Sequence, residues 1–192
     1  MYDAIVIGAR VAGSPTAMLL ARQGHRVLLV DRASFPSDTV STHFLHPGGS
    51  SYLNRWGLLD KVLETTPSWT RFTLTREGIS ATGAPPLEAV QRRLGALHGD
   101  DGSYAVARWC GPRRTVLDGL LVDAAAESGA EVRQGTTIDE LVWDGERVVG
   151  VKGRSPTGAA FTETARIVIG ADGRHSPTAR AVGVEPYNER PR

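Results

Sequence analysis

The chain has 192 residues, of which 41% are hydrophobic and 22% charged, and its formal net charge is +1. This balance excludes a disordered or polybasic chain, and the length suits one domain or one domain with a small appendage. All of the 22 basic residues except Lys61 and Lys152 are Arg, but they are scattered without a basic stripe, so we expect no nucleic-acid partner.

The N-terminus and the cysteine count restrict the cellular setting. Cys110 is the single cysteine, which rules out an intramolecular disulfide, and Met1 leads directly into an apolar segment rather than a signal peptide. No apolar run approaches the roughly 20 residues that cross a bilayer. We therefore expect a cytoplasmic protein with no integral membrane segment, and its oligomeric state stays open.

The first 31 residues predict a β-strand, a glycine-rich turn, an α-helix and a second strand. The strand at Ala4–Ile7 is continuously apolar, as buried parallel strands are. After it come the turn Gly8–Gly13, a helix that contains Ala17–Ala21 and stops at Gly24, the strand Val27–Val30, and Asp31. This order is a βαβ unit, whose crossover is right-handed in nearly all proteins. The fold therefore begins as a Rossmann-type α/β fold.

The middle of the chain is more irregular. A polar stretch runs from Ser34 to His46, with Pro36 and Pro47 as breakers, before helices expected at Ser50–Trp56 and Leu58–Leu63. The segment from Trp69 to Trp109 alternates at Phe72 and Leu74 and again at Tyr104 and Val106. It predicts two or three antiparallel strands, interrupted by a turn at Gly83–Pro86.

The last third returns to the Rossmann pattern. Helical spacing over Arg113–Glu127 ends near Gly129, and Glu131–Arg133 is expected to be the third parallel strand. A β-meander follows over Thr137–Val142, Val148–Lys152 and Phe161–Thr164, with turns at Asp144-Gly145 and Pro156-Thr157-Gly158. A further strand, Arg166–Gly170, leads into Ala171-Asp172-Gly173.

The turn Gly8–Gly13 has the features of a phosphate-binding turn. Gly8 allows the tight strand-to-helix turn and Gly13 allows the helix to pack closely on the strand, so a pyrophosphate is expected at the helix N-terminus near Val11 and Ala12. Arg10 replaces the middle glycine of the GxGxxG pattern. Its side chain either lies along the phosphates or is solvated. The alternative is that Gly8 and Gly13 are ordinary turn glycines.

Asp31 ends the second strand, where a carboxylate accepts hydrogen bonds from an adenosine ribose. Because it would repel a 2′-phosphate, FAD or NAD is favoured over NADP at this site. Arg32, which follows it, is included in the predicted cofactor site.

A more specific pattern is Gly170-Ala171-Asp172-Gly173-Arg174-His175-Ser176-Pro177-Thr178-Ala179-Arg180. It resembles the GADGxxSxxR motif of FAD-dependent monooxygenases of the para-hydroxybenzoate hydroxylase type, a group that includes geranylgeranyl-reductase-like enzymes. The resemblance implies a GR2-like FAD-binding fold, in which Asp172 and Gly173 approach the riboflavin side of FAD.

Weaker segments agree with this family. Arg114-Thr115-Val116-Leu117 resembles its Arg-x-x-Leu element, whose Arg reaches the ribityl or phosphate region of the flavin. Ser41-Thr42-His43 resembles the loop that passes the flavin, which implies a contact by His43 and, less directly, His46. The position of Ile138 implies that its backbone groups contact adenine.

The resemblance also implies a domain organisation. Residues 1–68 and 113–186 would form the FAD-binding domain, 69–112 the start of an antiparallel substrate-domain sheet, and 187–192 a tail. Members of the family are commonly much longer, so the chain is expected to be either a fragment of a longer enzyme or a short relative.

The implied activity is that of an FAD-dependent oxidoreductase. NAD(P)H would be the co-substrate, and a monooxygenase acting on a small aromatic or polyketide-like compound is favoured over a C=C reductase. A non-catalytic nucleotide-binding fragment and an NAD-dependent dehydrogenase remain alternatives. No catalytic acid or base is assigned, because the cofactor carries the difficult chemistry.

Other assignments are disfavoured by residues that are missing. A disulfide reductase needs a second cysteine beside Cys110, and a flavin halogenase is expected to carry Trp-x-Trp-x-Ile-Pro, which this sequence lacks. No metal site is expected, since the histidines lack ligand spacing. Asp100-Asp101 is interpreted as a turn and Cys110 as a small buried residue. The four tryptophans are interpreted as packing residues rather than a substrate cage; they are Trp56, Trp69, Trp109 and Trp143.

Overall fold

A computed structural model describes residues 1–84, 86–98 and 108–185 of the chain. By its internal contacts the chain divides into two compact units, Met1–Ser37 with Leu121–Arg192 (unit 1) and Asp38–Leu120 (unit 2). The predicted division into an FAD-binding and a substrate domain at residues 68 and 113 stays a prediction.

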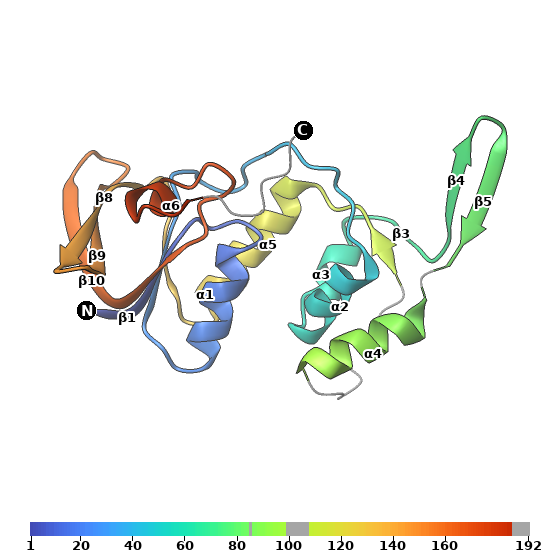
Figure 1. Cartoon of the computed structure of the whole chain (residues 1–192), viewed down its shortest axis with the longest axis horizontal. Helices are drawn as coiled ribbons and strands as arrows, with labels where there is room; N and C mark the ends of the chain where they lie inside the picture. Colours follow the sequence, from blue (N-terminus) through green and yellow to red (C-terminus); the bar gives the residue numbers. More distant parts are fainter. Residues whose placement is uncertain (85, 99–107, 186–192) are drawn as a thin grey trace. The chain divides into compact units, whose positions relative to one another are not determined.

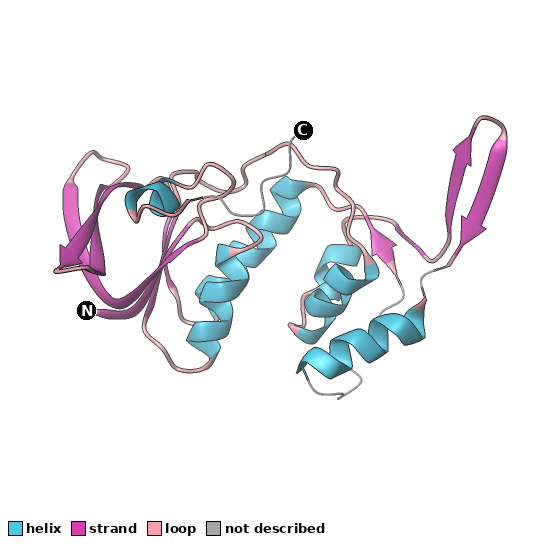
Figure 2. Ribbon diagram, in the orientation of Figure 1, coloured by secondary structure: helices cyan, strands magenta, loops and turns pink. Residues whose placement is uncertain are grey.

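Unit 1 is built on a six-stranded mixed sheet (Figures 1 and 2). Its strand order is β7-β2-β1-β10-β9-β8, with β1, β2, β7 and β10 parallel and β8, β9 and β10 an antiparallel meander. The strands are β1 (Tyr2–Ile7), β2 (Val27–Val30), β7 (Glu131–Arg133), β8 (Thr137–Asp144), β9 (Arg147–Arg154) and β10 (Ala160–Gly170). The predicted Rossmann-type sheet with a β-meander is confirmed.

The strand β10 corrects one prediction. Phe161–Thr164 and Arg166–Gly170 were expected to be separate strands, but they are two halves of one continuous eleven-residue strand. The first half pairs antiparallel with β9 and the second half parallel with β1, from Ala165 opposite Tyr2 to Gly170 opposite Ile7. Neither glycine nor proline interrupts the strand at the change of partner, so one strand serves both the meander and the parallel sheet.

Two helices cover one face of the parallel strands. Helix α1 (Gly13–Arg22) connects β1 to β2 and is followed by Gly24 at φ +85°. Helix α5 (Arg114–Glu127) begins in unit 2, ends in unit 1 and precedes β7; Gly129 follows it at φ +100°, as predicted. Right-handed crossovers in the same direction along the sheet place α1 and the end of α5 on the same face.

The meander of β8, β9 and β10 covers the other face of the parallel strands. A core cluster joins Ile5, Ile7, Leu28 and Val30 of the parallel strands to residues of the meander (Val151 and Ala165), and Ile138, Leu141 and Phe161 pack against it. The parallel strands are therefore buried on both sides, which explains their continuous apolar runs. A short helix, α6 (Pro177–Ala181), follows the end of β10.

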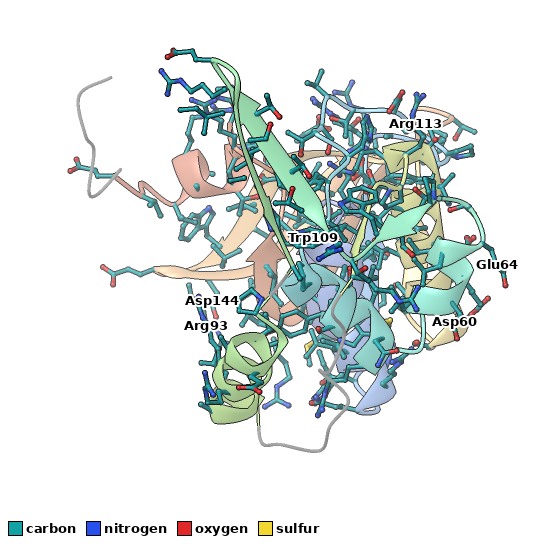
Figure 3. The ribbon with its side chains drawn as sticks, turned by 90° about the vertical axis from the view of Figure 1, so that its right-hand side faces the viewer. Asp60, Glu64, Arg93, Trp109, Arg113 and Asp144 are labelled. Atoms are coloured by element: carbon teal, nitrogen blue, oxygen red, sulfur yellow. The ribbon has the colours of Figure 1, made fainter. Side chains whose placement is uncertain are left out.

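The described residues of unit 2 form three complete helices, the first half of α5 and two small sheets. Helices α2 (Pro47–Arg55) and α3 (Leu59–Leu63) correspond to the predicted pair. Helix α2 begins three residues earlier than expected because Pro47 occupies its first turn, where proline is tolerated. Helix α3 buries Leu59 and Val62, while Asp60 and Glu64 project outward (Figure 3).

The segment after Trp69 differs from its prediction. Strand β3 (Ser68–Trp69) pairs with β6 (Trp109–Cys110), and β4 (Phe72–Arg76) forms a hairpin with β5 (Ile79–Gly83). A further strand was expected in this segment. That prediction is wrong over Leu87–His98, which forms helix α4. Val90, Leu94 and Leu97 carry helical spacing that the alternation hypothesis overlooked, and Leu94 is buried. Tyr104, Val106 and Asp100-Asp101 lie outside the described residues.

The tryptophans of unit 2 and unit 1 differ in their exposure. Trp109 is buried, and the ring of Trp69 lies 5.7 Å from that of Phe44. Trp143 on β8 is 45% exposed and pairs with Val148 in the β8–β9 ladder, so it lies in the sheet and not in the core. Cys110 is buried with a free thiol, as expected. Among the described helices, none is long and apolar enough to span a membrane.

Candidate functional site

The predicted phosphate turn lies between β1 and α1. Gly8 has φ +104°, which L-residues rarely adopt, and a Cβ there would overlap the carbonyl of Ala171. A Cβ on Gly13 would overlap the carbonyl of Gly8. Both glycines are therefore required by the backbone itself.

The second motif lies directly against this turn. The amide of Ala171 donates a hydrogen bond to the carbonyl of Ile7 over 2.8 Å, and the Cα of Asp172 lies 3.1 Å from where a Gly8 Cβ would be. The parallel pairing of Ile7 with Gly170 causes this contact, because it ends β1 and β10 at the same edge of the sheet. Ligands bind at such carboxyl edges in open α/β sheets.

The N-terminus of α1 is open to an anion. Ala12 at the N-cap makes no side-chain cap, and the first turn carries no acidic residue. Val11 is 48% exposed and Ala12 is also exposed. The positive end of the helix dipole thus lies beside the glycine turn without an acidic residue in the first turn of the helix, as a pyrophosphate site requires.

Asp31 is joined to the phosphate turn. Its Oδ2 accepts a hydrogen bond from the amide of Ala9 over 2.7 Å, and its Oδ1 accepts one from the amide of Ala33 over 2.8 Å. The carboxylate is half-buried, and each oxygen retains a second lone pair. The same group that fixes the turn therefore still has acceptor capacity for a ribose hydroxyl.

Asp172 is the second carboxylate at this edge. Its Oδ2 accepts a hydrogen bond from the amide of Thr178 over 2.9 Å, while its buried Oδ1 has no partner among the described residues. Burial acts to raise the pKa of Asp172, but hydrogen bonds from Ser176 and Thr178 hold that pKa below its ordinary value. An ionised carboxylate with an unpartnered oxygen suits a hydroxyl donor of a ligand.

Arg10 contacts the loop that follows β2. Its guanidinium donates to the hydroxyl and the carbonyl of Ser37, at 3.0 and 3.3 Å, and lies 5.5 Å from the centre of the Phe35 ring. Arg10 therefore holds the loop after β2 against the phosphate turn. Arg32 is exposed in the same loop.

Two further predicted residues lie in unit 1. Ile138 pairs with Gly153 in the β8–β9 ladder beside an irregularity in register, and its side chain packs on the core. Gly173 is exposed with φ +88° in the loop after β10.

His43 belongs to unit 2 and has an unusual conformation. Its φ is +51°, and its buried Nδ1 has no partner among the described residues. Its carbonyl lies 3.0 Å from where a Gly111 Cβ would be, so Gly111 is the residue that fits there. Strain and an unpartnered polar atom occur together at ligand sites more often than elsewhere.

The loop that carries His43 is fastened to the segment before α5. Leu45 and Cys110 exchange backbone hydrogen bonds of 2.9 and 3.3 Å. Asp38 forms a 2.9 Å ion pair with Arg113, and its pKa is lowered by the amide of Thr39 and by Arg113. His46 is exposed and packs edge-on against Phe44, at 4.7 Å between ring centres.

Arg114 begins α5 in unit 2. Its Nε and one terminal nitrogen pair with both oxygens of Asp118, each at 2.9 Å. Sequence reasoning missed Asp118, although a carboxylate four residues after an arginine is a recognisable helical pair. It also missed Ala171, whose importance depends on a contact between segments far apart in the sequence.

Two further features of the described residues were considered as sites. An open depression of about 460 Å³ lies on the meander, but no predicted site residue lines it, and its charged side chains pair as Asp139–Arg154 and Glu140–Lys152. The described residues contain no group of three histidine, cysteine or carboxylate side chains placed to hold a metal ion.

Comparison with known families accounts for these two motifs. A family model described as FAD binding domain matches residues 1–191. The chain belongs to this family of FAD-binding domains. FAD is the cofactor that the family binds, which sets aside the NAD-dependent dehydrogenase alternative.

Curated relatives include both branches that the motif implied. Aklavinone 12-hydroxylase DnrF of Streptomyces peucetius is 27% identical over 183 residues, which cover 95% of this chain and 37% of the relative. Digeranylgeranylglycerophospholipid reductase 2 of Methanothermobacter thermautotrophicus is 35% identical over 186 residues, covering 96% and 42%. The chain therefore spans about two fifths of the length of these relatives, and the predicted family resemblance is confirmed.

Solved structures share the fold. The myxobacterial chondrochloren halogenase CndH superposes with a TM-score of 0.74 at 27% identity, covering 94% of this chain and 39% of that protein. The p-nitrophenol 4-monooxygenase PnpA of Pseudomonas putida gives 0.75 at 20% identity, covering 95% and 44%, and shows the fold alone. Since halogenases share this fold, the fold does not separate them from monooxygenases, and the exclusion of a halogenase stays a prediction.

Proposed function

We propose that the protein is an NAD(P)H-dependent flavin monooxygenase that hydroxylates a small aromatic or polyketide-like substrate. The contact between the two motif turns at Gly8 and Ala171 carries the FAD-binding part of the proposal, because it builds one binding edge from residues 163 positions apart. The hydroxylase relative DnrF supports the reaction type.

In this proposal the adenosine half of FAD lies along the first βαβ unit. The pyrophosphate binds at the N-terminus of α1, over Val11 and Ala12, where the helix dipole favours an anion. Asp31 accepts hydrogen bonds from the ribose, Arg32 lies beside it, and the backbone of Ile138 contacts adenine.

The flavin half is assigned to the second motif and to two residues of unit 2. Asp172, whose Oδ1 has no partner in the described part of the chain, accepts a hydrogen bond from a hydroxyl of the ribityl chain, and Gly173 leaves room beside it. His43 and Arg114 donate to polar atoms of the flavin region. These roles follow the family motif residue by residue.

Bound FAD supplies the electron transfer, and the residues of this chain bind and orient it. The tight Gly8–Ala171 contact and the bonds from Asp31 to Ala9 and Ala33 hold the turns in place before the ligand arrives. Such preorganisation reduces the entropy lost on binding.

A second candidate is an FAD-dependent C=C reductase. The observation that favours it is the 35% identity to digeranylgeranylglycerophospholipid reductase 2, which exceeds the 27% to DnrF. Residues that contact the substrate would distinguish these two reactions. The two motif turns are assigned to FAD and do not distinguish them.

The test is to load the purified chain with FAD and follow NADH or NADPH oxidation together with oxygen consumption. A monooxygenase predicts flavin reduction by one of the two nucleotides and consumption of oxygen by the reduced flavin. Flavin reduction that leaves oxygen untouched but reduces an isoprenoid C=C bond favours the reductase. Binding of ADP and FAD with no reduction by either nucleotide contradicts both and favours the non-catalytic nucleotide-binding fragment.

A further inference from the structure

The ion pair between Arg114 and Asp118 in unit 2 is largely buried. The Asp118 side chain is fully buried and that of Arg114 is 14% exposed. The two N–H···O distances, both 2.9 Å, describe a side-on, bidentate pair between two flat groups.

Stability alone does not explain this arrangement. Arg114 is the first residue of α5, where the positive end of the helix dipole disfavours a cation. A buried ion pair is also commonly no more stabilising than an apolar pair of the same volume. A costly group at a helix N-terminus indicates a role beyond folding.

Asp118 binds one edge of the Arg114 guanidinium and leaves the other edge available. Asp118 receives Nε and one terminal nitrogen, so the second terminal nitrogen of Arg114 points away from the carboxylate. Arginine has many rotamers, and a bidentate partner restricts them before any ligand binds.

We propose that Asp118 is a positioning residue, which holds the Arg114 guanidinium in the orientation that binds oxygen atoms of the FAD phosphate–ribityl chain. This inference rests on the proposed FAD function and adds a residue to it. Asp118 itself touches no ligand; its carboxylate acts through Arg114.

The test compares the FAD dissociation constants of three variants with that of the unaltered chain. Asp118→Asn keeps the size of the side chain but removes the charge and one acceptor, and we expect FAD affinity to fall about tenfold. Asp60→Asn is the matched control, the same change on an exposed residue of the same unit (Figure 3), and is expected to leave affinity unchanged.

The double variant Arg114→Met with Asp118→Leu guards against misfolding of Asp118→Asn, because it replaces the ion pair by apolar groups. Circular dichroism and thermal unfolding establish that it folds, and we expect the same loss of FAD affinity. Unchanged affinity in either folded variant overturns the positioning role. Absence of FAD binding by the unaltered chain instead overturns the proposed function.

Discussion

The amide of Ala9 donates a hydrogen bond to the carboxylate of Asp31, 2.7 Å away, across 22 positions of the sequence. One residue lies in the phosphate turn after β1 and the other at the end of β2, so the bond joins the two parts of the adenosine site. Asp31 therefore has a structural task as well as a place in the proposed ribose contact.

Replacement of Asp31 by Ala is expected to destabilise the chain by about 1–3 kcal/mol, because the amides of Ala9 and Ala33 lose their acceptors. Urea unfolding of the ligand-free protein measures this change. Glu146→Ala removes an exposed carboxylate from the same unit and is expected to have little effect. Equal unfolding midpoints for both variants would show that the bonds contribute nothing.

Alanine substitutions at Gly24 and Gly8 separate the energetic cost of backbone strain from that of steric crowding. Gly24→Ala introduces a Cβ at φ +85° into open space and is expected to cost about 1–2 kcal/mol. Gly8→Ala adds an overlap with the Ala171 carbonyl to a similar strain, so its cost is expected to exceed about 3 kcal/mol. Similar losses for both variants in thermal unfolding would contradict the close contact of the two motif turns.

Asp172 is expected to give the chain acid-sensitive stability. Its folded pKa is lowered, since hydrogen bonds from Ser176 and Thr178 outweigh burial. Its contribution is therefore present above the unfolded-state pKa of about 3.9 and is lost as the pH falls through the folded value. The difference in unfolding free energy between the unaltered chain and Asp172→Asn should shrink on acidification below about pH 4. A difference that grows on acidification would contradict this sign.

The packing of helix α4 can be tested with two leucines that differ in exposure. Leu94 is 7% exposed and Leu97 is 64% exposed. Leu94→Ala is expected to cost about 2–3 kcal/mol and Leu97→Ala no more than about 0.5 kcal/mol. Unfolding by urea distinguishes the two, and equal costs would contradict the packing of this helix.

The parallel sheet was predictable because its signals are local. Continuous apolar runs at Ala4–Ile7 and Val27–Val30 reflect burial on both faces, and Gly24 and Gly129 end helices through positive φ. The helix at Leu87–His98 was missed because a few alternating residues on either side of it favoured strands over the spacing of Val90, Leu94 and Leu97.

The candidate site was predictable in its motifs but not in its contacts. The glycines and carboxylates follow from the chemistry of a dinucleotide, whereas the contact of Ala171 with Gly8 depends on the pairing of β10 with β1. The contacts of Arg10 were not predictable for a similar reason: its partners, Ser37 and Phe35, lie in a loop whose path the sequence does not specify.

The most direct test of FAD binding at the two turns is a parallel titration of FAD and ADP, followed by fluorescence and calorimetry, into the unaltered chain, Asp31→Ala and Asp172→Ala. We expect Asp31→Ala to weaken both ligands by a similar factor, and Asp172→Ala to weaken FAD about tenfold while ADP binding stays unchanged. A folded, unaltered chain that binds neither ligand, or folded variants that bind FAD as tightly as it does, would contradict the account.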